Sequence, residues 1–205
     1  IPSHKIKVLI DQGDVVSNRN FLISQNKLEW VLILDGDEIW TESAITESIK
    51  IIRESDLRLK FLISRYKNLL GDVFHYQEEL AGRYRIGPYR GHLTIRFVNL
   101  LLNPRSHFRG DYPLEGLSDS SSQFLQDIHT DEPVVDSPYL HATHLRQQKF
   151  KYELGQPMSN DFEYPKCFYL PKPNMVPSPW DKRSSSYILN AAWQSPLKYL
   201  KRYFV

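Results

Sequence analysis

The stretch that decides the fold is Glu-Trp-Val-Leu-Ile-Leu-Asp-Gly-Asp-Glu, residues 29–38, in which an apolar run stops at three carboxylates around a glycine. A run of Val, Leu and Ile without polar alternation predicts that residues 30–34 form a strand buried on both faces of a parallel sheet. Ligands of such sheets bind beyond the carboxyl ends of the strands. Acids are costly to bury without a partner, so we expect these three to face the ligand crevice.

The spacing of the acids favours a metal site. Asp35 and Asp37 lie two residues apart, so both carboxylates can turn toward one hard cation, and oxygen ligands suit Mg²⁺ or Mn²⁺. Gly36 between them lets the backbone bend and approach a bound phosphate closely. The plain alternative for the same residues is a solvated turn at the end of a strand.

Composition sets broad limits on the protein. Its 205 residues suit one domain with a small appendage, and 41% hydrophobic residues suffice for a core. A net charge of +2 does not call for a nucleic-acid partner. Cys167 is the single cysteine, which excludes an internal disulfide framework and fits a reducing compartment such as the cytoplasm. Because the sequence starts at Ile1 without Met, we expect a piece of a longer or processed protein.

Strand and helix patterns alternate along the first part of the chain, which indicates an α/β sheet. The expected strands are residues 6–10, 30–34, 60–66 and 93–97. The expected helices are residues 17–28, with Ser17 as N-cap, and residues 41–53, with Thr41 as N-cap.

Three later segments carry weaker patterns. Residues 82–91 predict a basic, aromatic loop, and residues 110–136 predict a long loop with one short helix. Dense prolines in residues 156–179 predict an extended arm that wraps the domain and covers its own aromatic side chains.

The last segment, residues 184–204, predicts a helix interrupted at Pro196. Its end, residues 197–204, mixes basic and aromatic side chains, so it either docks on the domain or makes peripheral contact with an anionic membrane surface. We therefore divide the chain into a ligand-binding unit, residues 1–150, and an arm with a terminal helix, residues 151–205.

Residues 18–39 resemble glycosyltransferase family 2, enzymes of the GT-A fold. The family pattern is an Arg-Asn that opens a helix, a polar turn, Glu-Trp, an apolar strand and Asp-x-Asp (DXD), matched here by Arg19, Asn20, Glu29, Trp30, Asp35, Asp37 and Glu38. The resemblance is clear over residues 6–53 and looser through Arg146. It implies a Rossmann-like, mostly parallel sheet with flanking helices. Family members carry further strands before the Arg-Asn helix, so the first strands and most base contacts are expected to be missing here.

The resemblance implies a metal-dependent, inverting transfer of a hexose from a nucleoside-diphosphate sugar to a saccharide, lipid-linked or protein acceptor. In that family the Asp-x-Asp holds the cation on the diphosphate, where negative charge grows as the glycosidic bond breaks. Asp37 is then the main metal ligand, and Asp35 acts through water or toward the ribose. Arg19, Asn20 and Arg146 are implied as further contacts of the nucleotide.

Two later elements are implied to complete the site. An inverting transfer needs a carboxylate that takes the proton of the attacking hydroxyl, and Glu115 is the first choice with Asp111 second. A late histidine that ligates the metal or touches the diphosphate is assigned to His144, with His141 as its rival. The plain alternatives are surface acids in a loop and histidines satisfied within the fold.

Two other functions remain open at this point. Residues 34–39 approach the Asp-x-Asp-x-Thr/Val signature of haloacid dehalogenase-like phosphohydrolases, with Asp35 as the nucleophile, although Ile39 stands where Thr or Val is expected. The short segment before Ser17 also leaves open a fragment that binds a sugar nucleotide without turnover.

Overall fold

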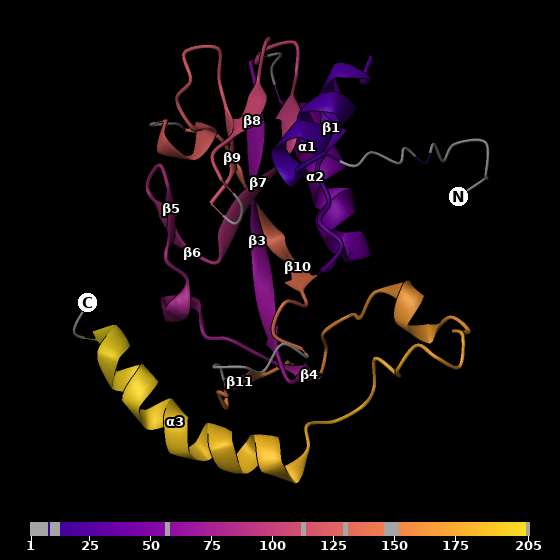
Figure 1. Ribbon diagram of the computed structural model, residues 1–205, viewed down its shortest axis with the longest axis vertical. Coiled ribbons are helices and arrows are strands. Elements are labelled where there is room, and N and C mark those ends of the chain that lie inside the picture. Colours follow the sequence, from indigo (N-terminus) through magenta and orange to yellow (C-terminus); the bar gives the residue numbers. More distant parts are fainter. Residues whose placement is uncertain are drawn as a thin grey trace.

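The structure, a computed structural model, describes Val8 and residues 13–55, 58–111, 114–128, 131–145 and 152–203 (Figure 1). Within these ranges the chain is a mixed α/β protein whose main sheet has the strand order β1-β7-β3-β10-β2. The strand expected at residues 6–10 lies, apart from Val8, outside the described residues.

The long strands lie at the centre of the sheet: β3 (Phe61–Leu70), β7 (Leu93–Asn99) and β10 (Val134–His141). The edges are β1 (Trp30–Leu32) and β2 (Glu38–Ile39). Only β3 and β10 run parallel in this order, whereas the pairs β1–β7, β7–β3 and β10–β2 are antiparallel. The expectation of a mostly parallel sheet is therefore wrong. Short strands β4 (Asp72–Tyr76) and β11 (Gln156–Pro157) extend from the end of β3.

Strand β1 explains why the prediction of a fully buried strand was wrong. It lies at the sheet edge beside β7, and its three residues are only half-buried. Its apolar residues serve both faces, because Trp30 packs into one core cluster and Val31 into the opposite one. Leu34, beyond the strand, is exposed. The continuous apolar run therefore belongs to an edge strand whose side chains pack on both faces of the sheet.

The first two helices each begin directly after a residue whose side chain caps the helix. Helix α2 (Glu42–Glu54) confirms the helix expected at residues 41–53, and the Thr41 hydroxyl caps it by accepting from the Ala44 N–H at 3.1 Å. Helix α1 (Val15–Ser24) begins and ends earlier than expected. Its N-cap is Asp14, whose carboxylate accepts from the backbone N–H and the hydroxyl of Ser17, so Ser17 lies inside the helix.

The sheet carries apolar side chains on both faces, and different elements cover each face (Figure 1). Helix α2 packs over Leu62, Phe97 and Val135. Helix α1 and two hairpins cover Phe61, Ile63 and Val98 on the other side. The hairpins are β5–β6 (Tyr84–Ile86 and Tyr89–Gly91) and β8–β9 (His107–Arg109 and Gly116–Ser118).

Two segments expected as loops contain regular structure. Residues 82–91 form the hairpin β5–β6, which turns at Gly87 with a φ of 56°, a conformation that favours glycine. Residues 110–136 contain β9, the 3₁₀ helix η3 (Leu125–Asp127) and the start of β10. A second 3₁₀ turn, η2 (Glu79–Ala81), precedes the hairpin. The strands in these segments are three residues long or are interrupted by turns, so the alternation of apolar and polar side chains is too short to be recognised in the sequence.

A bulge in β10 ties the sheet to α2. The register of β10 against β3 shifts between Val135 and Tyr139. The backbone N–H groups of Asp136 and Ser137 donate instead to the Glu47 carboxylate, at 3.0 and 2.8 Å. The Thr41 hydroxyl donates to the carbonyl of Pro138 at 3.1 Å. Helix α2 thereby satisfies the backbone groups that the bulge removes from the ladder.

The C-terminal part runs along the lower edge of the molecule (Figure 1). In the proline-rich arm, the 3₁₀ helix η4 (Lys166–Tyr169) buries Phe168 against Tyr164 and Trp180, while Tyr169 stays exposed, contrary to expectation. Helix α3 (Ser185–Tyr203) then follows without interruption at Pro196. In the described part of the chain, no helix combines the length and apolar character needed to cross a membrane.

Candidate functional site

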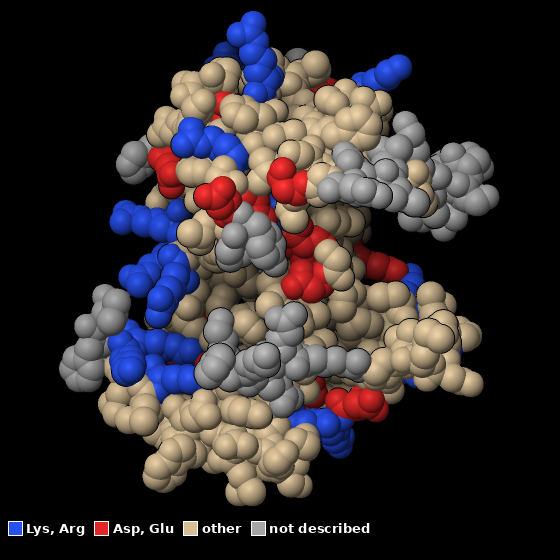
Figure 2. Space-filling model, in the orientation of Figure 1, with Lys and Arg blue, Asp and Glu red and all other residues tan. Residues whose placement is uncertain are grey.

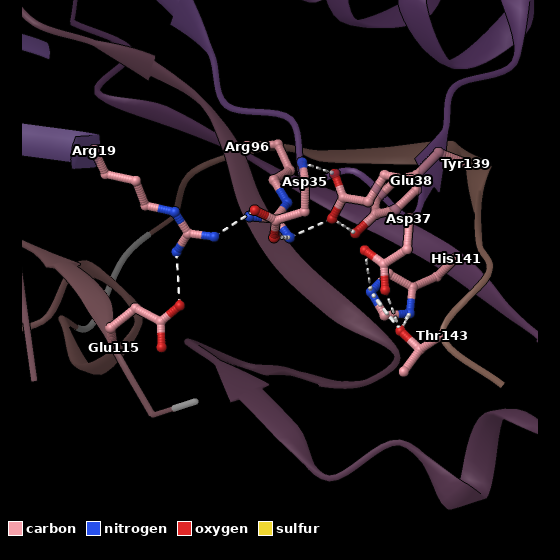
Figure 3. A network of polar contacts seen from close by, with 9 residues as sticks. All are labelled: Arg19, Asp35, Asp37, Glu38, Arg96, Glu115, Tyr139, His141 and Thr143. Atoms are coloured by element: carbon pink, nitrogen blue, oxygen red, sulfur yellow. Dashed lines mark hydrogen bonds and ion pairs between the residues drawn. The ribbon is translucent and has the colours of Figure 1, made fainter. Parts of the chain in front are cut away.

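Asp35 and Asp37 lie in the short connection from β1 to β2 at the edge of the sheet, and Glu38 is the first residue of β2 (Figure 3). The connection is a tight turn, closed by the Glu38 N–H donating to the Asp35 carbonyl at 3.1 Å. Strand β2 pairs with β10 so that Glu38 stands opposite His141, and the Ala142 N–H donates to the Asp37 carbonyl at 2.7 Å. The acid turn and the segment that contains His141 are about a hundred positions apart in the sequence and meet here. The sequence led us to expect a late histidine beside the acids.

Asp35 is held by two arginines. Its Oδ1 accepts from Arg19 Nη2 on α1, and its Oδ2 accepts from Arg96 Nη2 on β7 at 2.7 Å. Both oxygens of the carboxylate are therefore engaged by guanidinium groups, which fix its orientation. Asp35 anchors the turn between helix α1 and the sheet.

The side chain of Glu38 is fully buried beside Asp35. Its Oε1 accepts from the same Arg96 Nη2 and from the hydroxyl of Tyr139 at 3.0 Å, with a side-chain exposure of 0%. Burial raises the pKa of Tyr139 well above its ordinary value, so its hydroxyl stays protonated and donates. Glu38 is paired and hydrogen-bonded, as a buried carboxylate must be.

Asp37 is the accessible acid of the group, with 42% of its side chain exposed. Its Oδ2 accepts from the Thr143 hydroxyl at 2.5 Å, and its Oδ1 lies 3.9 Å from His141 Nε2. Thr143 Oγ1 also lies 3.0 Å from His141 Nδ1. Burial lowers the pKa of His141 despite the nearby carboxylates, which favours the neutral ring that can ligate a metal.

Glu115 joins this group through Arg19. Its Oε1 accepts from Arg19 Nη1 at 2.8 Å, and its side chain is only 6% exposed. Its Oε2 is buried and has no hydrogen-bond partner among the residues that the structure describes. Asp111 lies on the surface, where its carbonyl accepts from the Leu114 N–H at 2.7 Å. Of the two candidate bases, Glu115 is the one tied to the acid turn.

The other predicted residues have different settings. Asn20 binds the backbone of Phe108 on β8 through both amide atoms, at 2.9 and 2.6 Å, and so fastens α1 to the hairpin. The carbonyl of His144 accepts from the Gly71 N–H at the turn between β3 and β4. Arg146 lies outside the described residues. His141, the rival in the sequence, is the histidine beside Asp37.

The donor set around Asp37 suits a metal shared with a ligand. Among the residues that the structure describes, no three His, Cys, Asp or Glu side chains are grouped as a metal site. Asp37 and His141 offer two donors, next to the Thr143 hydroxyl. Such a small set does not make a closed structural site, but it fits Mg²⁺ or Mn²⁺ that takes its other ligands from phosphate and water.

Three residues of the network were not expected from the sequence as parts of a site. Arg96 read as an exposed position of an alternating strand, yet its side chain is 14% exposed and links Asp35 to Glu38. Thr143 and Tyr139 complete the contacts of Asp37 and Glu38. The available signal was a threonine between two histidines and an arginine directly before an aromatic residue, Phe97.

No protein-family model, no curated protein and no solved structure matched this chain.

Proposed function

We propose that the chain is a metal-dependent, inverting glycosyltransferase of the GT-A type, similar to family 2, that uses a nucleoside-diphosphate sugar. The observation that carries the proposal is the difference between the two aspartates of the Asp-x-Asp sequence. Asp35 is locked between Arg19 and Arg96, whereas Asp37 is open and lies beside His141. One acid thus holds the turn in place and the other is left to bind. The order of elements along the chain, α1, then β1, then the acids, is the order that the resemblance implies.

Asp37 and His141 are the residues that would hold Mg²⁺ or Mn²⁺, and such an ion supplies a Lewis acid for the leaving diphosphate. Thr143 fixes the Asp37 carboxylate through its hydroxyl. Arg19 and Arg96 keep positive charge beside the turn and are themselves held by carboxylates, so they stay aligned without a ligand.

Glu115 would take the proton from the acceptor hydroxyl. Its Oε1 is oriented by Arg19, while the buried Oε2 has no partner within the described part of the chain and can accept a proton. Because Arg19 contacts Asp35 as well, the base and the donor-binding turn share one positioning residue.

The same contacts weigh against phosphohydrolase chemistry. Such an enzyme would need Asp35 as a free nucleophile. Both of its oxygens instead accept from guanidinium groups, which lowers their nucleophilicity and blocks the approach of a phosphoryl group.

Titration calorimetry of the chain with nucleoside diphosphates tests the proposal, run with Mn²⁺ or Mg²⁺ and again with a chelator. We expect binding that needs the metal, lost in Asp37→Ala and retained in Asp127→Asn, a matched exposed acid. Metal-dependent release of sugar from a nucleoside-diphosphate sugar, without hydrolysis of a simple phosphomonoester, is the expected activity. Equal affinity with and without metal, or an unchanged Asp37→Ala variant, would refute the metal role.

A further inference from the structure

Helix α3 is held to the domain by small and polar contacts on its inner face. Tyr187, Ala191 and Ser195 recur every four residues and are 1%, 0% and 0% exposed. The Ser195 hydroxyl accepts from the Leu154 N–H at 2.8 Å, and the Tyr199 hydroxyl accepts from the Gly155 N–H at 3.2 Å. Helix α3 therefore packs, along most of its inner face, against the segment that precedes β11.

An ion pair fixes the C-terminal end of the same face. Arg202 donates to Glu153 through two nitrogens, each at 2.8 Å, and to Glu78 at 2.6 Å. The Glu153 side chain is 1% exposed, so this bidentate pair is shielded from water on the carboxylate side. The rotation of α3 about its own axis is thereby set.

The opposite face of α3 is apolar and exposed, which reverses the usual arrangement of a docked helix. It carries a stripe at spacings of four, four and three: Leu189, Trp193, Leu197 and Leu200, exposed by 73%, 82%, 62% and 56%. Residues at these spacings share one side of a helix. Single exposed apolar residues are ordinary on a surface, but a contiguous stripe marks an interaction site.

The charges on the helix indicate what covers this stripe. The sequence of α3 contains Lys198, Lys201 and Arg202 and no Asp or Glu. Lys198 and Arg202 donate to the domain, to the Tyr152 carbonyl and to Glu153 respectively, whereas Lys201 is exposed. Figure 2 shows the lower edge of the molecule, over α3, without acidic side chains on its outer surface and with basic side chains gathered toward its C-terminal end, while acidic side chains gather near the middle of the face. Apolar side chains with a tryptophan, an exposed lysine and no acid on the helix match the boundary of an anionic bilayer, where an amphipathic helix lies in the plane of the head groups.

We propose that the outer face of α3, defined by Leu189, Trp193, Leu197 and Leu200, lies on an anionic membrane surface. Lys201, which is exposed and follows Leu197 by four residues, faces the lipid head groups. This proposal does not depend on the chemistry proposed for the acid turn.

Co-sedimentation of the full chain with vesicles of phosphatidylcholine, with and without phosphatidylglycerol, tests the surface. We expect binding to the anionic vesicles, weakened by salt, and a blue shift of tryptophan emission as Trp193 leaves water. The double variant Trp193→Ser, Leu197→Ser should lose at least about tenfold in partitioning, because two large apolar groups no longer enter the interface. Lys201→Glu should weaken binding to the anionic vesicles alone.

The matched control is Leu28→Ser, Leu101→Ser, two leucines that are 72% and 69% exposed elsewhere on the domain, which should bind as the wild type does. Equal thermal unfolding of all variants establishes that they are folded. Absence of binding to either vesicle, or equal binding by the α3 variant, would overturn the proposal. So would light scattering that shows a dimer dissociated by the α3 substitutions, since a second copy of the chain would then be the occupant.

Discussion

Arg19 Nη1 donates to Glu115 Oε1 at 2.8 Å, across 96 positions of the sequence, while the other nitrogen of the same guanidinium donates to Asp35. The proposed base and the proposed donor-binding turn are thus fixed by one side chain on α1. A substitution at Arg19 therefore affects both groups at once.

Arg19→Met should lower stability and proposed activity together. It leaves the nearly buried Glu115 carboxylate unpaired, which costs on the order of 1–3 kcal/mol, and frees one side of Asp35. Urea unfolding and donor titration on the same preparation measure the two effects. Arg53→Met, at an exposed position of α2, should change neither. Unchanged stability in Arg19→Met would show that the contact contributes little.

Glu115→Gln should lower the transfer rate by roughly 10²–10⁴, the usual effect of losing a general base, with donor affinity little changed. The amide can still accept from Arg19, so the fold should be retained. Rates at saturating donor, together with donor affinities from calorimetry, give the comparison. Near-normal turnover in Glu115→Gln with none in Asp111→Asn would transfer the role to Asp111.

His141→Ala should weaken Mn²⁺-supported binding of a nucleoside diphosphate more than Mg²⁺-supported binding. Imidazole is a competent ligand for Mn²⁺, whereas Mg²⁺ prefers oxygen, and His141 Nε2 lies 3.9 Å from Asp37 Oδ1. His144→Ala is the matched comparison, because it removes the other histidine of the same segment, whose carbonyl accepts from the Gly71 N–H. A larger loss in His144→Ala than in His141→Ala would restore the first choice made from the sequence.

Glu47 should make the stability of the protein depend on pH in the acid range. Burial alone would raise the pKa of Glu47, but hydrogen bonds from Ser137 and Asp136 outweigh it and hold the pKa below its ordinary value of 4.5. A lowered pKa contributes stability above the pKa of the unfolded chain, and this contribution is lost as the pH falls through the folded value.

Glu47→Gln should therefore cost about 1 kcal/mol at neutral pH, and its difference from the wild type should shrink below about pH 4.5. Urea unfolding at a series of pH values measures this. Glu54→Gln, at an exposed position of the same helix, should follow the wild type. A difference that stays constant down to acid pH would show that the charge of Glu47 is not involved.

Capping residues and apolar periodicity, which depend only on neighbouring residues, were enough to predict several helices and strands. Thr41 and the spacing of isoleucines after it predicted α2 almost to the residue. The strand expected at residues 60–66 is present and runs on to Leu70. The start of α1 was misplaced because Asp14 and Ser17 are both good caps, and the pattern does not rank them.

Pairing between distant strands could not be predicted in the same way. The apolar run at residues 30–34 would have the same composition in a central strand of a parallel sheet and in an edge strand of an antiparallel pair. Composition does not identify the neighbouring strand. In the site, the Asp-x-Asp pattern located Asp35 and Asp37 but not their different settings. Those depend on Arg96, whose role requires knowing that β7 lies next to β1.

The bulge in β10 makes the candidate site unusually sensitive to the length of the chain. Tyr139 and His141 reach the acid turn because they share one side of β10, while Leu140 between them is buried in the core. Side chains alternate along a strand, so removing a single residue from the bulge would turn His141 toward the core and Leu140 toward Asp37. Related chains that keep this site should vary in the length of other loops. They should conserve the exact number of residues between Asp136 and Ser137, which bind Glu47, and His141.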